Sequence, residues 1–174
     1  MLVLLPAVLR DWRGFSFGGN VRDLRTVVVI DYQNVHLVGH ALYDATRHLP
    51  RHETLIDPLL FAQHLLRARN AAQRPGMSNA VLRRVEVFSG QPSPEHDRNG
   101  YARRLAQKSQ WERDARVAVT LRPLKYEYER DAAGNHLRDV HGHRIVVGTP
   151  REKGVDVLCA LAGSGLPGSR ASIS

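Results

Sequence analysis

Two aspartates and an asparagine have the types and spacing that acid-dependent chemistry would need. Asp31 directly follows Val27-Val28-Val29-Ile30, and Asn34 lies three residues further on. A run of four β-branched residues is typical of a strand buried on both faces of a parallel sheet. Such a strand delivers Asp31 to the carboxyl edge, where open α/β sheets bind ligands. The alternative is that Asp31 only caps the helix that follows, because Asp and Asn both cap well.

The second candidate acid is Asp156, in the otherwise apolar segment 155–162. A buried acid is costly unless a metal ion or a nearby cation such as Lys153 compensates it. The alternative is an acid in the first turn of a helix, where the helix dipole favours it. Together, Asp31 and Asp156 could converge on Mg²⁺ or Mn²⁺, which take oxygen ligands. Such an ion can polarise a phosphoryl oxygen and activate water for in-line attack.

Alternating strand and helix patterns indicate the fold that must hold these acids. Asp57-Pro58 is typical of an N-cap followed by a first helical residue. The alternation predicts an α/β fold with a parallel sheet, and right-handed crossovers place all strand carboxyl ends on one side. We see no internal repeat. Strands are expected at 27–30, 81–88 and 117–121, helices at 58–70, 98–113 and 149–162, and a hairpin at 125–147.

The charge balance favours a nucleic-acid partner. The 174 residues carry a formal net charge of +8, and all the basic residues except Lys108, Lys125 and Lys153 are arginine. Arginine binds phosphate bidentately and stacks on bases. Alternatively, a GC-rich genome encodes Arg in place of Lys and the charge serves solubility. The residues that we expect to grip RNA phosphates are Arg98, Arg103, Arg104, Lys108 and Lys153.

Length and cysteine content set the domain organisation and compartment. The length suits one domain, expected at 26–162, with an N-terminal extension at 1–25 and a disordered tail at 163–174. No apolar run approaches the ~20 residues of a membrane span. The single cysteine, Cys159, is expected in the core and fits a reducing cytoplasm. A homo-oligomer is compatible with these observations.

Several motifs resemble those of NYN domains, which are PIN-like ribonucleases. The similarity lies in Val28–Val35, in Val87–Pro92, in Trp111–Asp114 and in Glu152–Val157. The resemblance covers about residues 26–162. It implies a three-layer α/β fold, RNA cleavage dependent on Mg or Mn, and catalytic roles for Asp31, Asn34 and Asp156.

The sequence departs from the family after Asp156. NYN domains continue into a strand with a further acidic motif, whereas no residue after Asp156 is acidic here. We therefore expect a C-terminally truncated domain, and an inactive fragment that binds RNA without cleaving it is the alternative function. A phosphatase with Asp31 as nucleophile ranks last, because position 33 is Gln where that chemistry needs a second Asp.

One further cluster could bind a transition metal. His136, His141 and His143 accompany Asp139 within the expected hairpin. Zinc sites need four ligands in a tighter pattern. We therefore expect solvated loop histidines here.

Overall fold

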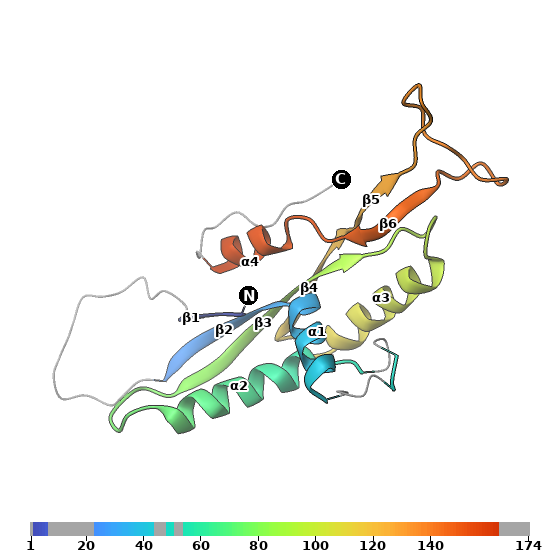
Figure 1. Ribbon diagram of the computed structural model, residues 1–174. Helices are drawn as coiled ribbons and strands as arrows, with labels where there is room; N and C mark the ends of the chain where they lie inside the picture. Colours follow the sequence, from blue (N-terminus) through green and yellow to red (C-terminus); the bar gives the residue numbers. More distant parts are fainter. Residues whose placement is uncertain (1, 7–22, 44–47, 51–53, 164–174) are drawn as a thin grey trace.

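The computed structural model describes residues 2–6, 23–43, 48–50 and 54–163 (Figure 1). No helix within these ranges has both the length and the apolar character needed to cross a membrane. The elements, in chain order, are β1 (Leu2–Pro6), β2 (Leu24–Asp31), α1 (Tyr32–Tyr43), α2 (Pro58–Ala72), β3 (Ala80–Gln91), α3 (Arg98–Trp111), β4 (Val117–Pro123), β5 (Lys125–Tyr128), β6 (Val146–Arg151) and α4 (Val155–Gly163).

The main sheet has the strand order β1-β2-β3-β4. Strands β2, β3 and β4 are parallel, with Asp31 opposite Phe88 and Phe88 opposite Thr120. Their carboxyl ends therefore meet at one edge of the sheet, as the alternation of elements predicted. The sheet prediction is thus confirmed as an α/β arrangement with three parallel strands flanked by helices.

Strand β1 was not expected from the sequence. Residues 2–6 run antiparallel to β2, with Leu2 opposite Ile30 and Pro6 opposite Thr26. Residues 2–6 of the expected N-terminal extension thus form an edge strand, because β2 has an open edge on that side with which the segment pairs. Residues 7–22 and the tail at 164–174 lie outside the described residues.

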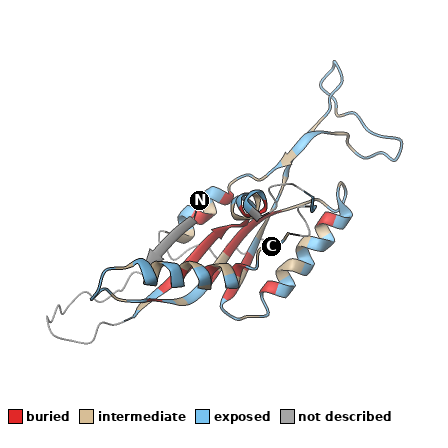
Figure 2. Ribbon diagram, turned by 60° about the horizontal axis from the view of Figure 1, so that its bottom comes forward, coloured by how far each residue is buried: buried red, intermediate tan, exposed pale blue. Residues whose placement is uncertain are grey.

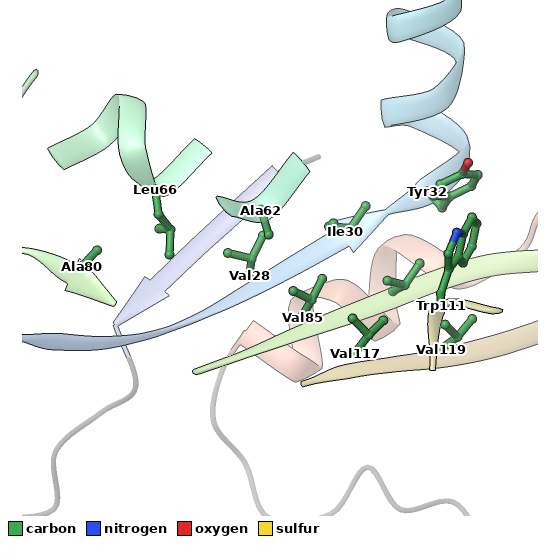
Figure 3. Close-up of a cluster of buried hydrophobic side chains, with 11 residues drawn as sticks. Val28, Ile30, Tyr32, Ala62, Leu66, Ala80, Val85, Trp111, Val117 and Val119 are labelled. Carbon is green, nitrogen blue, oxygen red and sulfur yellow. The ribbon is translucent and has the colours of Figure 1, made fainter. Parts of the chain in front are cut away.

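Helices cover both faces of the sheet (Figures 1 and 2). Alternate residues of β2 belong to two separate core clusters. Val28 and Ile30 pack in a cluster with Ala62 of α2 and Trp111 of α3 (Figure 3). On the opposite face, Val29 packs with a cluster from β3 and α4. Val28 and Val29 are both 0% exposed. Each buried side chain of this kind contributes roughly 1.5–3 kcal/mol relative to an exposed one.

The last helix begins later than the sequence indicated. The pattern predicted a helix over 149–162, but Thr149–Arg151 belong to β6 and α4 starts at Val155. Gly154 separates the two elements with a φ of 79°, a left-handed conformation that favours glycine. The strand-to-helix turn at 152–154 therefore lies where a continuous helix was expected. By contrast, the helix start at Asp57-Pro58 is confirmed, because the Asp57 side chain accepts a hydrogen bond from the Leu60 amide.

Residues 125–151 form an arm that extends beyond the main sheet (Figure 1). Within the arm, β5 and β6 pair in an antiparallel manner. Its distal part contains two turns of the same build at 130–137 and 138–145. In each turn an aspartate, Asp131 or Asp139, accepts amide hydrogen bonds from residues two and four positions later. In each, the preceding arginine donates to a glycine carbonyl, at 2.7 Å to Gly134 and 2.6 Å to Gly142. The expectation of no internal repeat is therefore wrong for the arm.

Backbone hydrogen bonds close the arm at its centre. The amide of Glu129 donates to the Ile145 carbonyl, that of Ile145 donates to Leu137, and that of Leu137 donates to Glu129. These three residues are spaced eight apart, so each turn returns the chain to the same point. The repeat is visible in the sequence as Arg-Asp at 130–131 and again at 138–139, followed by Gly134 and Gly142 respectively.

Candidate functional site

Asp31 occupies the carboxyl end of β2, directly before α1, and is 6% exposed. Its Oδ1 accepts the backbone amide of Asn34 at 3.2 Å, and its Oδ2 accepts the Asn34 side-chain amide at 2.9 Å. The first of these is a helix N-cap hydrogen bond. Asp31 therefore does cap α1, as one alternative proposed. Each carboxylate oxygen has further lone-pair capacity, so capping is compatible with a second ligand.

Glu152 is a second carboxylate at this edge, and it was not selected from the sequence. It lies in the turn between β6 and α4, and its Oε1 accepts a hydrogen bond from the amide of Gly90 near the end of β3. Burial raises the pKa of Glu152 and the charge of Asp31 raises it further, whereas the Gly90 bond and the charge of Arg104 lower it. The negative charge of Asp31 at the carboxyl edge of the sheet therefore disfavours the charged form of Glu152.

Gly90 is required for this placement of Glu152. A Cβ atom at position 90 would lie 2.6 Å from Glu152 Oε1 and would also overlap the Leu124 side chain. Only a residue without a side chain leaves room for the carboxylate here. The sequence offered one signal for Glu152, an acid between a β-rich segment and a helix, but the expected helix over 149–162 concealed it.

Arg103 and Arg104 of α3 line a cleft of about 310 Å³ together with Glu152, whereas Asp31 is not among its lining residues. Arg104 is half-buried, lies 5.6 Å from the centre of the Tyr32 ring and donates to Gln107 at 2.9 Å. Its burial lowers the pKa of the guanidinium from its usual value. The polar residues that line the cleft are Tyr32, Gln33, His36, Asp97, Arg103, Arg104, Gln107 and Glu152.

Three of the five expected RNA-binding residues lie apart from this cleft lining. Lys108 donates to Glu112 at 2.7 Å and to the Val119 carbonyl at 2.5 Å, so its ammonium ties α3 to β4. Arg98 is exposed at the start of α3, and Lys153 is exposed after Glu152. Arg103 and Arg104 are the two that line it.

Asp156 lies in the first turn of α4 and is exposed, which matches the helix-start alternative. Cys159 lies one turn further and is fully buried beside Val29 and Phe88, as expected of a core residue. Burial raises the pKa of the Cys159 thiol to about 11, and the charges of Asp31, Asp156 and Glu152 contribute to the rise. The charges of all three acids therefore disfavour the thiolate form of Cys159.

The next feature of the site is the arrangement of possible metal ligands in the part of the chain that the structure describes. No group of three or more His, Cys, Asp or Glu side chains there is arranged to hold an ion. This includes the arm, where His141 and His143 are exposed and His143 Nδ1 lies 3.6 Å from Asp139 Oδ2. The strongest candidate donors remain Asp31 and Glu152, which are coupled electrostatically.

Comparison with known proteins returns no match to this chain among protein-family models, curated proteins or solved structures.

Proposed function

We propose that this chain is a divalent-metal-dependent ribonuclease of the NYN type with a PIN-like fold. One observation carries the proposal: Asp31 ends β2, Glu152 is hydrogen-bonded to Gly90 near the end of the adjacent strand β3, and Glu152 shares a cleft with Arg104. Acidic groups flanked by arginines suit a phosphodiester, because the arginines hold phosphate and the acids handle a cation or a proton. The resemblance of the Val28–Val35 and Glu152–Val157 segments to NYN motifs supports the same reading.

The donor set fits Mg²⁺ or Mn²⁺ better than a transition metal. Mg²⁺ is commonly held by one or two carboxylates, with water and substrate phosphates completing its shell. Asp31 and Glu152 would supply the two carboxylates. When bound, the ion would neutralise the phosphate and lower the pKa of a coordinated water. With two carboxylates we expect saturation only near ~10⁻³ M metal, as in the weakest oxygen-ligand sites.

The chain's own residues have distinct tasks in this proposal. Asn34 holds the Asp31 carboxylate through two hydrogen bonds, which fixes its orientation. The Gly90 amide does the same for Glu152. Arg104 is held against the Tyr32 ring and Gln107, so its remaining N–H groups can bind phosphate without a large loss of side-chain entropy.

The test is cleavage of single-stranded and structured RNA in Mn²⁺. Asp31→Asn and Glu152→Gln should each reduce the rate by at least about 100-fold, a size common for loss of a catalytic group. Asp23→Asn and Glu129→Gln make the same chemical changes at exposed sites away from the cleft and should cleave like the wild type. Equal cleavage rates for the wild type, Asp31→Asn and Glu152→Gln would overturn the proposal.

One observation favours a second candidate, a module that binds RNA without cleaving it. Among the described residues the acids do not form a group of three, and both Asp31 oxygens already accept bonds from Asn34. This candidate predicts RNA binding that is unchanged by EDTA and falls steeply with salt concentration. Turnover that depends on Mn²⁺ would exclude it.

A further inference from the structure

A second cavity, of about 680 Å³, lies at the base of the arm. It shares four lining residues with the cleft, namely Pro92, Asp97, Leu124 and Pro150. The two hollows therefore form adjoining parts of one concave surface. The volume falls within the range of about 300–1,000 Å³ that small-molecule sites occupy, so a nucleoside fits.

Aromatic rings form one part of this cavity and are fixed in place. His96 and Tyr126 line it, with ring centroids 4.8 Å apart and an interplanar angle of 46°. The Tyr126 hydroxyl accepts the Ser93 amide at 2.8 Å, and His96 Nε2 lies 3.2 Å from the Tyr128 hydroxyl. A ring whose polar end is already hydrogen-bonded is fixed in position, so a ligand can stack on its face without a further loss of side-chain entropy. Aromatic faces of this kind stack nucleobases at about 1–3 kcal/mol per base.

Arg144 supplies hydrogen-bond donors to the same cavity. Its guanidinium lies 4.1 Å from the centre of the Tyr128 ring, and the arginine is half-buried. Stacking leaves the in-plane N–H groups available, and among the described residues no carboxylate lies within ion-pair distance of Arg144. The fork of an arginine matches the O6 and N7 acceptors of guanine.

Three carboxylates also line the cavity, and one of them is available as an acceptor. Asp97 accepts the Gly100 amide as the N-cap of α3, and Asp139 accepts the amides of its own turn. The Glu95 side chain is exposed and takes no hydrogen bond from any residue that the structure describes. The cavity lining contains three carboxylates and the guanidinium of Arg144. This excess of negative charge disfavours a phosphate and favours a neutral ligand that donates hydrogen bonds.

We propose that this second cavity is a guanine-binding subsite for the RNA nucleotide next to the phosphate in the cleft. The inference rests on the proposed function only in assuming that the bound polymer is RNA. Guanine stacks on Tyr126 and His96, accepts from Arg144 at O6 and N7, and donates from N1 and N2 to Glu95. The other bases lack two adjacent donors for the Glu95 carboxylate. Adenine and cytosine present one amino donor next to a ring-nitrogen acceptor, which a carboxylate repels. Uracil presents one N–H between two carbonyl acceptors.

The experiment measures binding of short single-stranded RNAs that carry one variable base among uridines. Fluorescence anisotropy in EDTA separates binding from cleavage. Guanosine should bind about 10-fold more tightly than uridine or adenosine, since a bidentate base contact is worth roughly 1–3 kcal/mol of discrimination. Inosine, which lacks the N2 amino group, should fall between guanosine and adenosine.

Variants then assign the preference to the cavity. Glu95→Gln and Arg144→Ala should each reduce the guanosine preference to within about twofold. Glu95→Gln changes an exposed side chain and should fold like the wild type, which thermal melts verify. Glu129→Gln on the arm and Arg67→Ala on α2 are exposed control sites and should keep the preference.

The outcomes separate this inference from the proposed ribonuclease. Mn²⁺-dependent cleavage with no preference for guanosine would overturn the subsite and leave the nuclease intact. A guanosine preference that both cavity variants abolish, without any cleavage in Mn²⁺, would support the subsite and overturn the nuclease. A preference that persists in both cavity variants would overturn the subsite, because guanine would then be bound elsewhere.

Discussion

Glu152 is a partly buried acid whose titration should be visible in the stability of the protein. Burial and the charge of Asp31 raise its folded pKa above the usual 4.5. The folded state therefore keeps the proton to a higher pH than the unfolded chain. The free energy of unfolding must fall as the pH rises through the window that opens at 4.5. Glu152→Gln should remove this component of the pH dependence, and urea unfolding at a series of pH values measures it.

The matched control for Glu152 is Glu129→Gln, which replaces an exposed carboxylate on the arm. It should leave the pH-dependent component assigned to Glu152 unchanged. If Glu152→Gln and the wild type show parallel profiles, Glu152 does not titrate abnormally and its coupling to Asp31 is absent in solution.

Cys159 gives a second prediction at the residue scale. The thiol is fully buried and its pKa is raised to about 11. Because the thiolate is the reactive form, the folded protein should react with iodoacetamide at pH 8 at least about 100-fold more slowly than the urea-unfolded chain. Mass spectrometry of the alkylated peptide measures both rates. Equal rates would show that α4 opens readily and does not seal the core.

Among the elements, α3 is the one that positions the arginines, and its start depends on Gly100. Asp97 caps the helix by accepting the Gly100 amide at 2.7 Å. A Cβ atom at Gly100 would overlap the Asp97 carboxylate. Gly→Ala inside a helix usually adds about 1 kcal/mol, but loss of an N-cap costs about 0.5–2 kcal/mol. The two terms nearly cancel, so we expect Gly100→Ala to change stability by anything from a gain of about 0.5 to a loss of about 1 kcal/mol, without the full gain that is usual for Gly→Ala.

Ser109→Ala is the contrasting change in the same helix. Ser109 is exposed near the end of α3, so the substitution should add a few tenths of a kcal/mol through helix propensity alone. Chemical denaturation measures both variants. A gain of the full ~1 kcal/mol for Gly100→Ala would mean that the Asp97 cap is not formed.

For the whole molecule, the antiparallel strand β1 is the feature with the largest consequence. It covers the edge of β2 through five paired positions. Cross-strand pairs contribute roughly 0.2–1 kcal/mol each, so deleting residues 2–6 should cost about 1–5 kcal/mol. The uncovered edge should also promote association between copies, because it offers unpaired N–H and C=O groups. Thermal melts and light scattering measure the two effects, and deletion of residues 170–174 is the matched control.

An unchanged melting temperature and an unchanged monomer fraction in the β1 deletion would contradict this pairing.

The arm gives the molecule its second large-scale feature. Most of its residues are exposed, as Figure 2 shows by their colour. Its stability therefore depends on the two Asp turns and on the triplet of backbone bonds at Glu129, Leu137 and Ile145.

The sequence alone determined the parts of this protein that depend on local pattern. The aliphatic run before Asp31 predicted a buried strand, and Asp57-Pro58 predicted a helix start, because burial periodicity and capping are written in neighbouring residues. It also predicted Cys159 in the core. Asp31 at the carboxyl edge follows directly from the parallel sheet.

Only the tertiary structure decided which acids meet. Glu152 reaches the cleft because Gly90, 62 residues away, leaves room for its carboxylate. Lys108 turns to Glu112 and Val119, although its place among arginines suggested phosphate binding. The pairing of residues 2–6 with β2 and the meeting of Glu95 and Arg144 in one cavity also join distant segments. Such contacts depend on how elements pack in space, and no local pattern specifies them.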